Sequence, residues 1–451
     1  MKRLFGTDGI RGIAYKDITK ELVIKVADAI AYIFNKKDNG IKVIIGNDGR
    51  ESANMILSTL KEELLSCGIS VLDAGLIPTP GISYLVKYYN YDLGIMISAS
   101  HNPHEYNGIK IFDKEGYKLS DDLESNIEDL IFDNIKYSST KRGIILDSRD
   151  VIKEYGNHLL DSLNKYNNNN VNYNNLNIGI DASNGASSKV CEYIFSKLGS
   201  KYHIINNAPN GTNINNNCGS THPEVLSSYV INNKLDIGIA YDGDADRVVF
   251  IDELGNIING DYTLAIISND LKNKNRLNKN TIVGTILSNL GLLEYCKNND
   301  IEFITTNVGD KYVLEYLRDN NLSLGGEEAG HIILKEYCNT GDGPLTSLIM
   351  LSILASTNTT FSNLTKIMHK YPEVHINIKV NNKNDFATSN MIEDSIKEIK
   401  NNFNGNYRLV IRPSGTEPLV RIVLEGEELK VLEESSNKIK SIIKNLNMEV
   451  V

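Results

Sequence analysis

A serine at the end of an apolar run is the first residue of this sequence that is placed to do chemistry. Residues 93–97 are apolar and strand-like, and residues 98–103 read Ser-Ala-Ser-His-Asn-Pro, a polar loop closed by proline. Strand ends in α/β proteins present loops to ligands, so the hydroxyl of Ser100 is a candidate nucleophile. A plain turn, in which hydroxyls and Asn102 cap their own backbone, is the alternative that these residues leave open.

Three carboxylates at alternate positions form a second candidate site. Residues 242–247 read Asp-Gly-Asp-Ala-Asp-Arg, and alternate side chains of an extended segment share one face. The small residues between them let the loop curl, so that oxygens of Asp242, Asp244 and Asp246 converge. Hard oxygen ligands of this kind suit Mg²⁺, and the spacing of an EF-hand is not followed. A solvated acidic loop is the alternative.

A segment near the end of the chain offers the groups that bind phosphate. Residues 412–418 read Arg-Pro-Ser-Gly-Thr-Glu-Pro, which supplies a guanidinium fork, two hydroxyls and a glycine amide open to close approach. Arg421 adds a second positive charge. A simple hairpin turn is the alternative for this segment.

Further carboxylates and cations lie in two other regions. Residues 324–331, Leu-Gly-Gly-Glu-Glu-Ala-Gly-His, hold a carboxylate pair suited to accepting protons from sugar hydroxyls, although a loop without this role fits as well. Arg11 and Lys110 flank the serine loop, where a cation can move a proton or steady phosphoryl charge. Solvated surface positions are the alternative for both.

The segments that must position these groups alternate between helix and strand. The serine loop lies in residues 1–155. In this region the sequence predicts helices at 19–34, 52–67 and 81–89 and strands at 41–46, 69–73 and 93–97. It also predicts a glycine-rich loop at 2–12 and a turn at Pro78-Thr79-Pro80. Such alternation requires crossover connections and predicts a mostly parallel or mixed sheet covered on both faces.

The alternation continues in two more units and changes in the last. Residues 156–254 and 255–369 predict further α/β units, with strands at 178–181, 202–205, 236–241, 281–285 and 301–305, a helix at 187–198 and an asparagine-rich surface loop at 165–177. A short echo between residues 92–95 and 236–239 also hints at repeated units. Residues 370–451 predict a small α+β domain, with strands at 375–380, 407–411 and 419–424 and helices at 392–399 and 429–446.

Composition limits the partners. The 451-residue chain has a net charge of −10 and no basic run, so nucleic acid is not expected as a partner. No apolar run approaches the roughly 20 residues that span a bilayer, and the first residues lack a secretion signal, so we expect no membrane association and a cytoplasmic location. The five cysteines are scattered without a CxxC pair, so neither disulfides nor a zinc site is expected.

The order of the motifs is typical of a known superfamily. The chain resembles the α-D-phosphohexomutase superfamily over its whole length through these motifs: GTDGIRG at 6–12, ISASHNP at 97–103 with NGIK at 107–110, DGDADR at 242–247, GGEEAGH at 325–331 and RPSGTEP at 412–418. Within this superfamily, the chain resembles the bacterial phosphoglucosamine mutases in particular. Three motifs carry this narrower resemblance: NINNNCGSTHPE at 213–224, NVGDKYV at 307–313 and NTGDG at 339–343.

The resemblance implies a fold and a set of residue roles. The fold is three similar α/β units with mixed sheets plus a C-terminal α+β domain, a heart-shaped molecule whose central cleft takes one loop from each domain. Ser100 carries the phosphoryl group, and a phosphoserine oxygen joins the three aspartates in holding Mg²⁺. The remaining roles are transfer (His101, Lys110, Arg11), contact beside the metal (Arg247), sugar recognition (Glu327, His331) and distal phosphate binding (Arg412, Ser414, Gly415, Thr416, Arg421).

The implied reaction converts glucosamine 6-phosphate to glucosamine 1-phosphate, which feeds UDP-N-acetylglucosamine and cell-wall precursor synthesis. Glucosamine 1,6-bisphosphate or glucose 1,6-bisphosphate serves as intermediate or activator, the partner is a small phosphosugar, and a homodimer is compatible with the resemblance. The last domain is expected to move as a lid. One position departs from the pattern, because similar enzymes usually have serine where this chain has Ala329.

Three alternatives stand beside this interpretation. A phosphomannomutase or phosphoglucomutase performs the same chemistry on another sugar. A non-catalytic phosphosugar-binding protein keeps the phosphate clamp but loses Ser100 or an aspartate ligand, and none is lost here. A hydrolase with an aspartyl nucleophile also uses alternate aspartates, yet it leaves Ser100 without a role.

Overall fold

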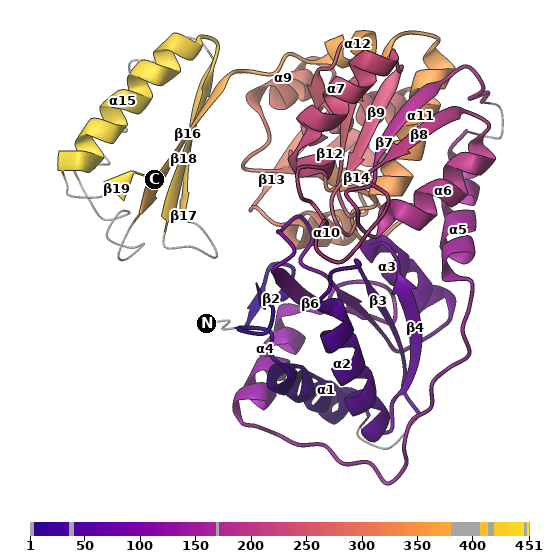
Figure 1. Cartoon of the computed structure of the whole chain (residues 1–451). Coiled ribbons are helices and arrows are strands. Elements are labelled where there is room, and N and C mark those ends of the chain that lie inside the picture. Colours follow the sequence, from indigo (N-terminus) through magenta and orange to yellow (C-terminus); the bar gives the residue numbers. More distant parts are fainter. Residues whose placement is uncertain are drawn as a thin grey trace.

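The computed structural model describes residues 4–35, 40–167, 171–379, 406–413, 419–445 and 449–450. These residues form four sheets that follow one another along the chain, each with its own helices (Figure 1). The first three units are α/β and the last is α+β, so the predicted fold class is confirmed. The predicted boundaries after residues 155, 254 and 369 remain predictions.

The first unit has a six-stranded mixed sheet, in the order β1-β2-β6-β5-β3-β4. Its strands are β1 Phe5–Gly6, β2 Gly9–Ile13, β3 Lys42–Asn47, β4 Ser70–Leu76, β5 Leu93–Ile97 and β6 Tyr106–Asp113. The central strands β4, β3 and β5 are parallel, whereas β6, β2 and β1 add antiparallel pairs. One face is covered by α1 Lys20–Phe34, α2 Ala53–Ser66 and α4 Asp121–Phe132, and the other by α3 Thr79–Tyr88.

Two local predictions in this unit were wrong. The glycine-rich segment at 2–12 is not a loop throughout, because from Phe5 it forms the β1–β2 hairpin on the edge of the sheet. The segment Pro78-Thr79-Pro80 is the first turn of α3 and not a turn before it. Proline is tolerated there because the first backbone N–H groups of a helix have no intrahelical partner.

The second unit has a five-stranded sheet, in the order β11-β10-β9-β7-β8. Its elements are α5 Val151–Asn167, β7 Asn177–Asp181, α6 Ser187–Leu198, β8 Lys201–Ile205, η1 Gly219–Thr221, α7 Pro223–Asn233, β9 Ile237–Tyr241, β10 Val248–Asp252 and β11 Ile257–Ile258. Helix α5 runs to Asn167, so the first residues of the predicted 165–177 loop are helical.

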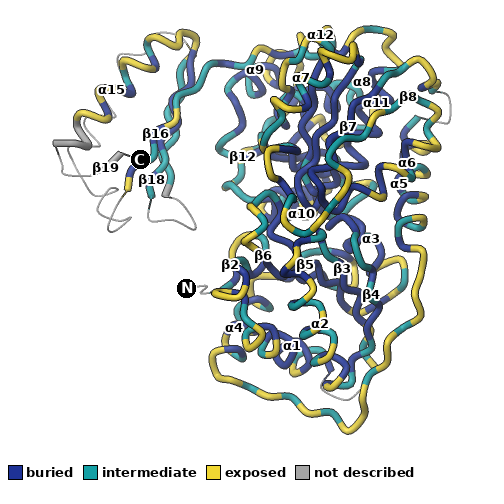
Figure 2. The backbone as a smooth tube through the Cα atoms, viewed as in Figure 1, coloured by how far each residue is buried: buried dark blue, intermediate teal, exposed yellow. Residues whose placement is uncertain are grey.

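The third unit has a four-stranded sheet, in the order β13-β12-β14-β15. Its elements are α8 Gly260–Asn273, η2 Asn278–Asn280, β12 Thr281–Thr285, α9 Leu290–Asn298, β13 Glu302–Thr306, α10 Asp310–Asp319, β14 Leu324–Gly326, β15 Ile332–Leu334, α11 Gly343–Thr357, α12 Phe361–Leu364 and η3 Thr365–Ile367. Helix α11 is buried on all sides from Gly343 to Leu354 and packs against α5 and α8, so the second and third units share one continuous core (Figure 2).

In the residues described for it, the fourth unit is a small antiparallel sheet covered by a long helix, α15. Its elements are β16 Glu373–Lys379, β17 Tyr407–Pro413, β18 Leu419–Gly426, α15 Leu429–Asn445 and β19 Glu449–Val450, with the strand order β17-β18-β16-β19. The unit stands beside the third unit, in yellow in Figure 1. It contacts the third unit through Arg408 Nη2, which donates to the Ser288 carbonyl, and through Asn406 Nδ2, which donates to Glu294 Oε1. The predicted helix at 392–399 lies outside the described residues. None of the helices described here is long and apolar enough to cross a membrane.

Candidate active site

Ser100 follows β5 and lies against the acidic loop of the second unit. Its Oγ donates a hydrogen bond of 2.6 Å to Asp242 Oδ2, and the residue is 1% exposed. The backbone of Ser100 is left-handed, with φ of 53°, a conformation that costs a non-glycine residue roughly 1–3 kcal/mol. The structure therefore brings together two motifs that lie far apart in the sequence.

Residues that the sequence analysis did not identify hold the serine loop. The Ser100 carbonyl accepts from Arg50 Nη2 at 2.7 Å and from Asn215 Nδ2 at 2.8 Å. Arg50 is fully buried and pairs with Asp48, which also accepts from Ser98 Oγ at 2.6 Å. One feature of the sequence could have marked Asp48 and Arg50 as candidate site residues, namely that they follow the apolar strand at 41–46.

The three aspartates converge as predicted from their spacing. Asp242, Asp244 and Asp246 are buried, and one oxygen of each lies within 4.8 Å of the others, so this is not a solvated acidic loop. Thr79, at the start of α3, holds the loop from the first unit: its N–H donates to the Asp244 carbonyl at 2.9 Å and its Oγ1 to Asp244 Oδ2 at 2.5 Å. Thr79 was not identified from the sequence, because its partner is distant in the chain.

The charges of this cluster favour a bound cation. Burial, and then the charges of Asp246 and Asp244, raise the pKa of Asp242 well above its usual range. Asp244 Oδ1 and Asp246 Oδ1 are buried without a hydrogen-bond partner in the part of the chain that the structure describes. Three carboxylates with oxygens left over match the hard ligands of a divalent cation, so the donor set fits the expected metal.

Lys110, on β6, supplies a fixed positive charge. Its Nζ lies 2.6 Å from Asp244 Oδ2, 3.1 Å from Asp246 Oδ2 and 2.9 Å from Asp8 Oδ2. Burial opposes this charge, but Asp244, Asp246 and Asp8 outweigh it and hold the pKa of Lys110 well above its usual value. Arg11, on β2, pairs with Asp8 at the same place.

Arg247 and His101 form a second pair beside the aspartates. The Arg247 N–H donates to Asp242 Oδ1 at 3.1 Å, and its Nη1 donates to His101 Nδ1 at 3.0 Å. Burial, with the charges of Arg247 and Arg11, lowers the pKa of the His101 imidazole to about 3. His101 is therefore neutral near pH 7.

The residues of the predicted sugar loop contact two different parts of the third unit. Glu327 Oε1 accepts from the Gly309 N–H at 3.0 Å, and His331 Nε2 lies 3.4 Å from Asp310 Oδ2. Glu328 is instead paired with Lys370 at 3.0 Å, so the expected carboxylate pair is split between two environments.

The predicted phosphate-binding arginines lie opposite each other on two strands. Arg412 of β17 is the cross-strand partner of Arg421 of β18. Burial, and then the charge of Arg421, lower the pKa of Arg412, while Glu327 acts in the opposite direction. Two guanidinium groups placed in this way favour an anion between them. Ser414, Gly415 and Thr416 lie outside the described residues.

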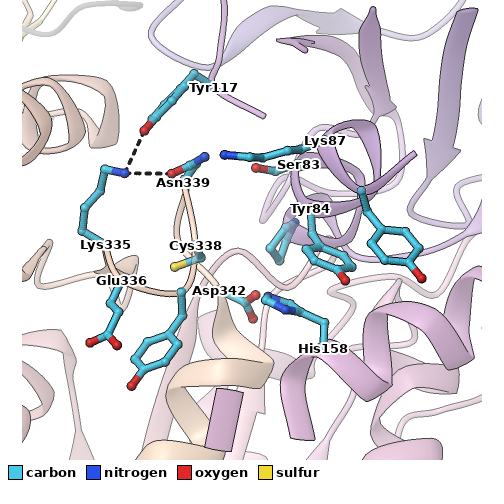
Figure 3. Close-up of a pocket in the computed structure, with 13 residues that line it drawn as sticks. Ser83, Tyr84, Lys87, Tyr117, His158, Lys335, Glu336, Cys338, Asn339 and Asp342 are labelled. Carbon is cyan, nitrogen blue, oxygen red and sulfur yellow. Dashed lines mark hydrogen bonds between the residues drawn. The ribbon is translucent and has the colours of Figure 1, made fainter. Parts of the chain in front are cut away.

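A separate pocket of about 400 Å³ lies between α3, α5 and the chain around 335–342 (Figure 3). Lys335 Nζ donates there to the Tyr117 hydroxyl at 2.7 Å and to Asn339 Oδ1 at 2.9 Å, while the rings of Tyr84 and His158 stack at 3.8 Å. None of the predicted site residues lines this pocket, so it is distinct from the candidate active site.

Comparison with protein families accounts for nearly the whole chain. Residues 2–138, 153–255 and 259–371 match the phosphoglucomutase/phosphomannomutase alpha/beta/alpha domains I, II and III, and residues 376–440 match the C-terminal domain of the same family. The chain belongs to the phosphoglucomutase/phosphomannomutase family.

Relatives within this family carry a narrower name. A phosphoglucosamine mutase of Caldicellulosiruptor bescii is 43% identical over 451 residues, and one of Clostridium botulinum strain Kyoto is 45% identical over 452 residues. Each alignment covers 99% of this chain and 99% of the relative. The predicted resemblance to phosphoglucosamine mutases, and to the phosphohexomutase superfamily, is confirmed.

Solved structures of other proteins share the fold. A phosphoglucomutase/phosphomannomutase family protein of Burkholderia thailandensis has a TM-score of 0.81 at 21% identity, covering 99% of this chain and 98% of its own. An N-acetylphosphoglucosamine mutase of Aspergillus fumigatus, solved in complex with GlcNAc-6P and magnesium, has a TM-score of 0.70 at 16% identity, covering 99% and 96%.

Proposed function

We propose that the protein interconverts glucosamine 6-phosphate and glucosamine 1-phosphate, with Ser100 as the phosphoryl carrier. The observation that carries the proposal is the hydrogen bond from Ser100 Oγ to Asp242 within a buried group of three carboxylates. The names of the 43–45% identical relatives support the amino-sugar substrate.

The reaction consists of two phosphoryl transfers. In the first, the bond between Ser100 Oγ and phosphorus breaks and a bond between phosphorus and O1 of glucosamine 6-phosphate forms. O1 gives up its hydroxyl proton, and Ser100 Oγ takes up a proton as its phosphoryl group leaves. The 1,6-bisphosphate then turns around in the site. In the second, the bond between O6 and phosphorus breaks and a bond between phosphorus and Ser100 Oγ forms. Ser100 Oγ gives up its hydroxyl proton, O6 takes up a proton, and glucosamine 1-phosphate is released.

The protein contributes position and charge, because phosphoryl transfer needs little covalent chemistry beyond the nucleophile. Lys110, which is paired with the aspartates, and the Arg247 guanidinium, which donates to His101, supply positive charge for the moving phosphoryl group. Glu327 accepts hydrogen bonds from sugar hydroxyls, and Arg412 with Arg421 holds the phosphate that is not reacting. A Mg²⁺ ion bound by the three aspartates and a phosphoserine oxygen would neutralise phosphoryl charge.

Replacing Ser100 tests the proposal. Ser100→Ala is expected to abolish turnover of glucosamine 6-phosphate, and the intact mass of the active wild-type protein should include one phosphoryl group that the variant lacks. Unchanged turnover in Ser100→Ala would exclude the phosphoserine mechanism. Phosphosugar binding without turnover in the wild type would identify a binding protein instead.

A glucose or mannose phosphate as preferred substrate is the second candidate. Ala329 bears on this choice, because it is exposed in the sugar loop and lacks the hydroxyl that similar enzymes offer to the sugar. Comparing kcat/KM for glucosamine, glucose and mannose phosphates separates the two. A clear preference for glucose or mannose phosphate contradicts the amino-sugar assignment.

A further inference from the structure

Two motifs contain aspartates to which the proposed reaction gives no role. They are Asp8, in residues 6–12, and Asp310, in residues 307–313. One lysine joins them: Lys118 Nζ forms an ion pair with Asp8 Oδ1 and lies 2.5 Å from Asp310 Oδ2. Asp8 belongs to the first unit, whereas Asp310 is the first residue of α10 in the third. Lys118 therefore bridges the two units.

On the first unit, the bridge reaches the phosphoryl-transfer residues. The two oxygens of Asp8 are divided, because Oδ1 pairs with Lys118 while Oδ2 pairs with Arg11 and with Lys110 at 2.9 Å. With one oxygen held by Lys118, the carboxylate is fixed in rotation and its second oxygen is aimed at Lys110. One of the three carboxylate contacts that position Lys110 therefore depends on Lys118 through Asp8.

On the third unit, the bridge reaches the sugar loop. Asp310 Oδ2 lies 3.4 Å from His331 Nε2, and the Gly309 N–H, directly before Asp310, donates to Glu327 Oε1 at 3.0 Å. The first turn of α10 thus contacts both sugar-recognition candidates. A shift of Asp310 moves the groups that hold Glu327 and His331.

The backbone conformation around Lys118 places its side chain between Asp8 and Asp310. After β6, which carries Lys110, the chain turns at Gly116, whose φ is 81°, and Lys118 pairs back with Phe112. The Lys118 side chain is only 8% exposed. A buried ammonium group is costly unless it is fully paired, and the two carboxylates supply that pairing.

We propose that Lys118 is a positioning residue that fixes the phosphoryl-transfer groups relative to the sugar loop by bridging Asp8 and Asp310. The inference rests on the proposed mutase function. Transfer between a serine on one unit and a sugar held by another requires the two to be aligned closely, and a misplacement of about 1 Å can slow such a reaction on the order of a hundredfold.

A second bridge between the same units provides a matched control. Lys311, the residue after Asp310, lies 2.5 Å from Asp121 Oδ1 and 3.3 Å from Glu124 Oε2 of the first unit. Lys311 is also largely buried, yet its two carboxylate partners belong to α4 and not to the candidate active site. Its loss removes an ion-paired bridge without disturbing Asp8.

The experiment compares Lys118→Met, Lys118→Arg, Asp310→Asn and Lys311→Met by steady-state kinetics with glucosamine 6-phosphate and by thermal unfolding. We expect Lys118→Met and Asp310→Asn to lower kcat about tenfold or more while KM changes less than about threefold. Lys118→Arg should recover part of kcat, and Lys311→Met should keep kcat within about twofold of wild type.

The outcomes separate this inference from the proposed function. If wild type is inactive on all three sugar phosphates, the proposed function fails. If wild type is active but Lys118→Met and Asp310→Asn lose no more kcat than Lys311→Met, the positioning role is overturned. Asp310→Asn leaves Lys118 paired with Asp8, so it decides the question even if Lys118→Met does not fold.

Discussion

Ser100 is held through its carbonyl oxygen, which leaves its hydroxyl available for chemistry. The Arg50 guanidinium has five donors in a rigid plane, and it donates to Asp48 and to the backbone carbonyls of Ser100, Pro103 and Tyr106. A lysine offers no such fork. The hydrogen bonds from Arg50 explain how Ser100 keeps its left-handed backbone conformation, because they offset the strain of that conformation.

Metal binding should be measurable as a gain in stability. Because the aspartate oxygens repel one another and two of them lack partners in the described part of the chain, Mg²⁺ at about a hundred times its dissociation constant should stabilise the fold by about 2.7 kcal/mol. Asp244→Asn should lose most of this gain in thermal unfolding with and without Mg²⁺. Asp181→Asn, a buried carboxylate outside the trio, should keep it. An equal gain in both variants would place the ion elsewhere.

The residues of the site divide into those that sequence can identify and those it cannot. Ser100, the three aspartates and Lys110 lie in motifs whose residue types already suggest the chemistry. Thr79 and Asn215 act by contacting residues that are distant in the chain. Nothing in their own neighbourhood predicts those contacts, because they depend on how the first and second units pack.

At the scale of elements, the alternation of helix and strand patterns along the sequence predicted central strands such as β5 but did not predict the hairpin at the edge of the first sheet. The run at 93–97 is β5, since a short apolar segment between polar turns has few other structures open to it. The β1–β2 hairpin was missed because glycine and polar residues dominate it. Helix α11 has no polar face, so its sequence does not reveal that it joins two units in one core.

Helix α8 begins with a buried carboxyl group that should make stability depend on pH. Burial, and then the charge of Glu328, raise the pKa of Asp261 from 3.8 to about 8. The folded state therefore binds a proton that the unfolded state releases, and stability should fall as pH rises between these values, by on the order of a few kcal/mol. Lys370 and Glu373 also face this group, with opposite effects.

Asp261→Asn should remove that pH dependence, because an amide can still accept the hydrogen bond from the Asn289 N–H, 2.8 Å in the wild type. Chemical denaturation at about pH 5 and about pH 9 measures the effect, and the variant should gain relative to wild type at the higher pH. Asp319→Asn, an exposed position on α10, should show no such gain. Equal pH dependence in Asp261→Asn and wild type would contradict the assignment.

At the scale of the whole molecule, the fourth unit is attached through a short segment that also reaches the sugar loop. Lys370 Nζ lies 3.0 Å from Glu328, next to Glu327, and 2.7 Å from Glu373 at the start of β16. Arg412 and Arg421 are carried on strands paired directly or indirectly with β16. The orientation of the phosphate-binding arginines is thus linked to the loop that contacts the sugar.

This link should influence how the fourth unit closes over substrate. We expect glucose 1,6-bisphosphate to reduce the radius of gyration of the wild-type protein in small-angle X-ray scattering, because the two arginines must reach the distal phosphate. Lys370→Met frees β16 from the sugar loop, so the KM for glucosamine 6-phosphate should rise about threefold to tenfold with a smaller change in kcat. Lys366→Met, whose partner Asn363 lies on the surface of the same segment, should leave both constants unchanged. If the ligand leaves the radius of gyration unchanged while turnover is normal, the fourth unit does not close over substrate, and this prediction is contradicted.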